Sequence, residues 1–164
     1  MNIFYIDPSP VQCAEWMVDK HVVKMILETC QLLSTAHRVL DGIKVIGKSK
    51  TGRNVTRYQL DDWRQDSIYQ ATHINHPSSV WCRENLANYV WLHSHLAALL
   101  QEYTFRYNKV HSCAFLCESL RTTPLNIQPG SFTQPTPAMD VSYIVSSDSV
   151  ENYRNYYKKG KKHL

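Results

Sequence analysis

Four polar side chains recur at helical spacing near the start of the chain: His21, Lys24, Glu28 and Gln31. Intervals of three, four and three residues place them along one side of an α-helix. An imidazole, an amine and a carboxylate in such a stripe could bind a substrate and move protons. Glu28 lies among apolar residues, so we expect it to be partly buried. A partly buried carboxylate is suited to proton transfer. A solvated helix face is the alternative interpretation, since charged stripes are common on helix surfaces.

Histidine and cysteine pairs elsewhere in the chain do not have the spacing of a metal site. The pairs are His73 with His76, His93 with His95, and Cys113 with Cys117. None matches an established zinc pattern, so we expect no metal. The chain has no dinucleotide-binding, serine-hydrolase or zincin signature. We therefore expect no cofactor, and no phosphate-loop NTPase either.

Basic residues are concentrated at the C-terminal end. Residues 153–164 carry five lysines and arginines and no acid, whereas the other 13 basic and 14 acidic residues sum to −1. The aromatic residues Tyr153, Tyr156 and Tyr157 are interleaved with these cations. Cations bind phosphates and aromatic rings stack on bases, so this tail favours nucleic-acid contact, with a simple solvated end as the alternative.

The apolar pattern predicts an all-α fold, a single compact domain over residues 1–164 with two long helices. Residues 11–40 form one continuous helical pattern that ends at Asp41 and Gly42. A second begins after the capping residues Ser78 and Ser79 and runs to about residue 108. Two shorter helices are expected at residues 111–120 and 149–159.

The remaining segments are expected to be irregular. Residues 1–5 are apolar and aromatic, which fits a short strand or an extended packed arm. Residues 42–75 form a glycine- and lysine-rich loop with a short helix at about residues 61–70. The many prolines of residues 123–137 exclude a regular element, so we expect an irregular crossing there.

Nothing in the sequence predicts contact with a membrane. No run approaches the roughly 18 apolar residues of a membrane span, and the N-terminus lacks a signal-peptide pattern. Five cysteines at irregular spacing argue against a disulfide framework. We expect a cytoplasmic protein with reduced cysteines.

The order of these motifs resembles the phage pyrimidine-dimer DNA glycosylases, the endonuclease V family of small helical repair enzymes. In that family an Asp-x-His motif precedes the catalytic glutamate, which follows the histidine by seven positions; Asp19, His21 and Glu28 have the same spacing. The family's second long helix resembles residues 89–106, and its aromatic-basic C-terminal motif is similar to residues 153–161. The chain also resembles other phage-encoded proteins.

The resemblance implies a cytoplasmic enzyme of the phage-infected bacterial host that acts on double-stranded DNA carrying a damaged or modified pyrimidine. The N-terminal amine attacks C1′ and forms an imine, and a glutamate assists before β-elimination cuts the strand. The resemblance implies that Glu28 is catalytic. It also implies that Met1 supplies the catalytic amine, because Asn2 is too large to favour removal of Met1. The implied substrate-binding residues are His21, Lys24, Gln31 and Arg38. The implied DNA-binding residues are Arg83, Arg106, Tyr153, Tyr156, Tyr157, Lys158 and Lys161.

Two positions depart from the family pattern, because Leu27 and Gln31 replace arginines that contact DNA in the family. Lys24 and Arg38 could compensate for these lost cations. Two alternative functions therefore stay open. One is a nucleic-acid-binding protein without catalysis, and the other is a small-nucleotide-binding protein of phage metabolism or counter-defence.

Overall fold

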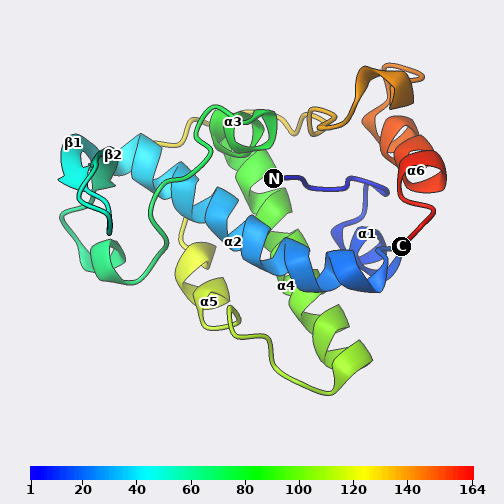
Figure 1. Ribbon diagram of the computed structural model, residues 1–164, viewed down its shortest axis with the longest axis horizontal. Helices are drawn as coiled ribbons and strands as arrows, with labels where there is room; N and C mark the ends of the chain where they lie inside the picture. The colour runs from blue at the N-terminus through cyan, green and yellow to red at the C-terminus, as the bar shows by residue number, and fades with distance from the viewer.

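Helix α2 (Asp19–Asp41) runs along the long axis of the protein, and helix α4 (Leu86–Tyr107) packs across it (Figure 1). The structure is a computed structural model that describes all 164 residues. Both helices bury their apolar positions in a common core, for example Met25 and Leu32 of α2 and Leu92 and Leu96 of α4. The other elements are α1 (Pro10–Glu15), β1 (Ile43–Lys48), β2 (Asn54–Gln59), η1 (Trp63–Asp66), α3 (Pro77–Glu84), α5 (Leu116–Arg121), η2 (Val141–Tyr143) and α6 (Ser149–Gly160).

The protein is mostly helical, but the all-α prediction is wrong at residues 43–59. Strands β1 and β2 form an antiparallel hairpin there, with Val45 opposite Arg57. The β-branched residues of this stretch favour extended backbone, and Gly52 has the positive φ of 79° that the turn requires. The predicted loop is therefore a paired ribbon, and the short helix expected after it is the single turn η1.

The hairpin also explains a coincidence of spacing. Although no phosphate-loop NTPase is expected, residues 42–49 fit the phosphate-loop pattern of glycine, four residues, glycine, lysine and serine. In a phosphate loop this segment joins a strand to a helix, and its free backbone N–H groups bind phosphate. Here it forms strand β1, whose backbone pairs with β2, and no helix follows it. The pattern therefore does not build a phosphate-loop site.

The predicted first helix is two helices, because the chain turns between α1 and α2. Val18 is extended, with φ −65° and ψ 152°. Arg106 of α4 donates hydrogen bonds to the carbonyls of Glu15 and Met17 and to the carboxylate of Asp19, at 2.8–2.9 Å. These bonds satisfy backbone groups that the break leaves free. A contact from a distant helix thus stabilises a break that no proline or glycine marks.

The predicted second long helix is also divided, at Asn85. The extended Asn85 ends α3, and its side chain accepts from the backbone N–H of Asn88 to begin α4. The expected caps were wrong as well. His76 caps α3 by accepting from the backbone N–H of Ser78, while Ser78 and Ser79 are buried.

The remaining predictions agree more closely with the structure. Residues 123–137, the proline-rich segment, contain no helix or strand, and α6 ends at Gly160. Helix α5 covers only the second half of the predicted residues 111–120 and extends to Arg121. Residues 1–6 form an extended, largely buried arm, which we call the N-terminal arm. No helix of the protein has both the length and the apolar character that a membrane crossing needs.

Candidate active site

The N-terminal arm brings the first residues of the chain onto the polar stripe of α2. The backbone N–H of Asn2 donates to Oε2 of Glu28 at 3.0 Å. The α-amino nitrogen of Met1 lies 3.8 Å from the same oxygen, close enough for an ion pair. The Glu28 side chain is buried, with 8% of the residue exposed. An amine and a carboxylate are thus adjacent in a site largely shielded from water.

Asn2 and Phe4 fix the direction of the N-terminal arm. The side-chain oxygen of Asn2 accepts from the N–H groups of Ile3 and Phe4, and its amide donates to the carbonyl of Ala138 at 2.8 Å. Phe4 has a positive φ of 53°, which is uncommon for a bulky residue. Its ring stacks on His21 at 4.0 Å between centroids. The resulting turn aims Met1 at Glu28.

His21 joins the N-terminal arm to α6. Its Nδ1 and the hydroxyl of Tyr157 share a hydrogen bond of 2.6 Å. Burial, together with the charges of Lys161 and Lys24, lowers the pKa of His21 to about 4. The imidazole is therefore neutral at physiological pH, and it holds aromatic residues of two elements beside the amine.

A polar cavity of about 180 Å³ surrounds the amine and the carboxylate. It is lined by Met1, Asn2, Phe4, His21, Lys24, Met25, Glu28, Tyr156 and Lys161. Nζ of Lys24 lies 3.3 Å from Oε1 of Glu28, while most of the Lys24 side chain is in solvent. Residues of the arm, α2 and the end of α6 thus meet at one site. A nucleophilic amine, a carboxylate for proton transfer and two cations for an anionic substrate are available there.

Residues 1–115 match the family model described as pyrimidine dimer DNA glycosylase. The match spans more than two thirds of the 164-residue chain. The chain belongs to this family. It is accordingly assigned to the DNA glycosylases, with DNA as its substrate class. No curated protein and no solved structure matches the chain.

The region shared with the family includes the N-terminal arm and helices α1 to α4, and therefore both Met1 and Glu28. Helix α6 lies beyond residue 115, although Tyr156 and Lys161 complete the cavity. The predicted substrate-binding residues His21 and Lys24 are in the cavity. Gln31 is half-buried farther along α2 and does not line the cavity.

Arg38 does not face the cavity, which corrects its assignment to substrate binding. Its residue is fully buried, and its five N–H groups all donate to the carbonyls of Tyr58, Gln65, Ile68 and Tyr69 or to the side chain of Gln65. A guanidinium has no further donor to offer. Arg38 therefore holds the segment after the hairpin against α2.

Arg106 is also occupied within the protein. In addition to its hydrogen bonds to residues at the turn between α1 and α2, Arg106 donates from its Nε to Glu102 at 2.7 Å. The family resemblance implied DNA contact for Arg106, whereas the structure places this guanidinium in an internal network. Its role here is to stabilise the turn that directs α2.

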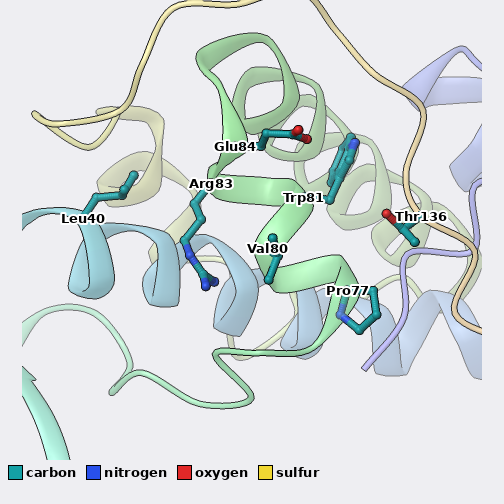
Figure 2. Close-up of a pocket in the computed structure, with 7 residues that line it drawn as sticks. All are labelled: Leu40, Pro77, Val80, Trp81, Arg83, Glu84 and Thr136. Carbon is teal, nitrogen blue, oxygen red and sulfur yellow. The ribbon is translucent and has the colours of Figure 1, made fainter.

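Arg83 lies on a groove beside α3 (Figure 2), and it is not among the residues that line the amine cavity. The groove has a volume of about 520 Å³ and is lined by Leu40, Pro77, Val80, Trp81, Arg83, Glu84 and Thr136. Arg83 donates to Ser79 and to the carbonyl of Ile74. Its guanidinium is thus partly engaged, and its assignment to DNA binding stays a prediction.

Some residues of the aromatic-basic tail are buried in the core, whereas others lie at the surface or line the cavity. Tyr153 is fully buried, and its hydroxyl accepts from the N–H of Ala138, so it packs the core instead of offering a ring to a base. Tyr157 is half-buried against His21. Lys158 lies on a surface pocket of about 350 Å³ beside Trp16, whose ring also lies 5.3 Å from the guanidinium carbon of Arg154.

Sequence reasoning missed Asn2 and Phe4 as parts of the site, although the apolar start of the chain indicated a packed arm. His76 does not line the cavity, although the charge of the N-terminal amine contributes, after burial, to lowering the pKa of its imidazole. Figure 1 shows the N-terminus near α3, the helix that His76 caps. No group of three or more His, Cys, Asp or Glu side chains is placed to hold a metal ion.

Proposed function

We propose that this protein is a DNA glycosylase with abasic-site lyase activity that acts on a damaged or modified pyrimidine. Its nucleophile is the α-amine of Met1, and Glu28 moves the protons. The observation that carries the proposal is the 3.8 Å approach of the amine to Oε2 of Glu28 in a polar cavity. Family membership supports the same class of reaction.

The amine must lose a proton before it can attack. An α-amine loses its proton more readily at pH 7 than a lysine side chain does. The Glu28 carboxylate, whose Oε2 lies 3.8 Å from the amine nitrogen, holds the amine at the cavity and can receive its proton. A lysine amine needs burial to become neutral at this pH, whereas the Lys24 side chain is 68% exposed. We therefore assign the attack to Met1 and a phosphate contact to Lys24.

The bond changes balance without a cofactor. The amine nitrogen forms a bond to C1′ while the bond from C1′ to the base breaks, and the base leaves with a proton. Loss of the amine proton and opening of the sugar ring give an imine at C1′, with O4′ protonated. Removal of a C2′ proton by Glu28 then expels the 3′ phosphate and cuts the strand. Water finally hydrolyses the imine and regenerates the amine.

The dimensions of the cavity favour a reaction on DNA over storage of a free nucleotide. Pockets for small ligands usually have volumes of roughly 300–1,000 Å³. The cavity beside Glu28 has about 180 Å³, which suits a sugar presented by a strand outside it. The amine and carboxylate also favour an enzyme over a non-catalytic binder, because binding alone does not need this pair.

Borohydride trapping on duplex DNA with one abasic site tests the proposal. We expect a covalent adduct, and peptide mass spectrometry should locate it on Met1. Glu28→Gln should slow trapping by about 10²- to 10⁴-fold, the usual contribution of a general acid or base. Glu118→Gln is the matched control, because Glu118 is an exposed residue of α5.

Three outcomes decide the test. An adduct on Met1 that depends on Glu28 supports the proposal. No adduct with the native protein, or an adduct on Lys24, would overturn the assigned nucleophile. An undiminished rate for Glu28→Gln would remove Glu28 from the chemistry. Thermal unfolding of each variant separates these outcomes from misfolding.

A further inference from the structure

The β1–β2 hairpin carries a second concentration of positive charge, as strong as that of the tail. Residues 42–60 contain five basic residues and no acid, so this segment carries +5. They are Lys44, Lys48, Lys50, Arg53 and Arg57. Outside the hairpin and the tail, 8 basic and 14 acidic residues leave the body at −6. Positive charge is thus segregated into two segments of an otherwise acidic protein, a distribution that steers a polyanion toward those segments.

None of the hairpin cations is neutralised within the protein. No salt bridge involves any of the five, although acidic residues flank the hairpin at Asp41 and Asp61. Asp41 is instead paired with Arg64. Lys48 donates to the side chain of Asn54, a neutral partner. The charges are therefore available to a ligand.

The residues of one hairpin face are suited to a nucleic-acid backbone. Side chains alternate between the faces of a strand, so Lys44, Ile46 and Lys48 share a face. Their cross-strand partners Tyr58, Thr56 and Asn54 lie on that face too. Ile46 has 70% of its surface exposed. This face offers cations and hydrogen-bonding groups to an elongated partner, and a two-stranded ribbon has a width that enters the major groove of DNA.

The two positive segments lie at opposite ends of the long axis, with the N-terminus between them (Figure 1). Helix α2 connects them: its first turn contacts α6 through His21 and Tyr157, and its last residue directly precedes the hairpin. Its 23 residues span about 34 Å, the length of roughly one turn of B-DNA. From Glu28 to Asp41 the distance is about 20 Å, or roughly six base pairs.

We propose that the hairpin is a second DNA-contact surface, which binds the phosphate backbone of the duplex about six base pairs from the reacting nucleotide. The inference rests on the proposed function, since it takes duplex DNA as the substrate. The duplex lies along α2, with the tail at one end and the hairpin at the other. Each end lowers the free energy of the complex by releasing counterions from the phosphates.

Charge-removing variants test this surface. The double variant Lys44→Gln with Lys48→Gln removes two cations from the outward face. Lys109→Gln with Arg121→Gln is the matched control, because both residues are exposed and lie outside the hairpin, the tail and the cavity. Binding is measured over a salt series on a 30-base-pair duplex with a central abasic analogue that lacks the C1′ oxygen.

We expect the slope of log K against log salt to fall by about 1.8 for the hairpin variant, at about 0.9 for each lost phosphate contact. The control should leave the slope unchanged. Trimming one arm of the duplex to three base pairs should abolish the difference between native and hairpin variant, whereas trimming the other arm should preserve it. This asymmetry would place the hairpin on one side of the reacting nucleotide.

Equal slopes for the hairpin variant and the native protein would overturn the inference. So would a loss in the control as large as that in the hairpin variant. Borohydride trapping at saturating DNA separates this result from the proposed function. If the native protein is trapped but the hairpin variant has the native slope, only the hairpin surface is rejected. If the hairpin variant has a reduced slope but the native protein is not trapped, only the imine chemistry is rejected.

Discussion

Helix α2 carries two buried polar clusters that differ in how completely their groups are paired. The open cluster contains Glu28, the Met1 amine, Asn2 and Lys24, and it borders a cavity. The closed cluster contains His37, Arg38, Asp41 and Arg64. In the closed cluster Arg64 donates to Asp41, to Asp62 and to Nδ1 of His37. Asp41 also accepts from the N–H groups of Leu125 and Asn126.

This difference indicates which of the two clusters on α2 is suited to catalysis. A buried charge is tolerated when opposite charges or backbone groups satisfy it, and the closed cluster meets that condition. In the open cluster the amine stands 3.8 Å from its carboxylate, and that carboxylate also faces an exposed lysine. Sequence spacing presents both clusters as polar residues on one helix. The closed cluster stabilises the fold because its groups are paired within the protein, whereas the open cluster forms the candidate active site.

The largest expected effect is on the closed cluster. Arg38→Met should lower the free energy of unfolding by about 3–4 kcal/mol, because it leaves buried carbonyl oxygens without donors. Glu28→Gln should change it by about 1 kcal/mol or less, since the glutamine oxygen still accepts from Asn2. Urea denaturation measures both values. Similar losses for the two variants would remove the distinction between the clusters.

A smaller loss of stability is expected when the pH is lowered. Burial and the charge of Arg64 lower the pKa of His37 to about 4, against about 6.5 in an unfolded chain. Between these values the unfolded chain binds the proton and the folded protein does not, so stability falls as the pH falls from 6.5 to 4. His37 should contribute a loss of about 1–2 kcal/mol at pH 5.

Unfolding by urea at pH 7 and pH 5 measures this decline. His37→Gln should show a shallower decline than the native protein, because its amide does not titrate. The cavity that the open cluster borders is also lined by a histidine of the same kind, since burial lowers the pKa of His21 to about 4. A decline of equal depth in native and variant proteins would contradict a neutral, buried His37.

The smallest expected effect on stability concerns Lys24. Its exposed pair with Glu28, four residues along the helix, should contribute only about 0.3–0.5 kcal/mol. Lys24→Ala should nevertheless weaken DNA binding and reduce the salt slope by about 0.9, if one phosphate contact is lost. Lys20→Ala, an exposed change one turn earlier, serves as control. A stability loss above about 1 kcal/mol would make Lys24 part of the fold instead.

The sequence by itself determined where most of the helical residues lie, though not the breaks at Val18 and Asn85, and it determined the stripe from His21 to Glu28. Helical periodicity is local, because side chains three and four residues apart share a face whatever lies around them. The spacing of Asp19, His21 and Glu28 also carried the family resemblance, which the match over residues 1–115 confirms. The end of α6 at Gly160 was predicted for the same local reason.

Only the tertiary structure decided which polar residues meet. The contact of Asn2 with Glu28 joins residues 26 positions apart, and the contact of Asn2 with Ala138 spans 136 positions. Arg38 had the residue type for a phosphate contact, but the carbonyls that occupy it come from strand β2 and from the segment after the hairpin. No local pattern encodes such partners, because they depend on how whole elements pack. Packing therefore converted an ordinary polar stripe into a site by placing the N-terminal amine beside one carboxylate.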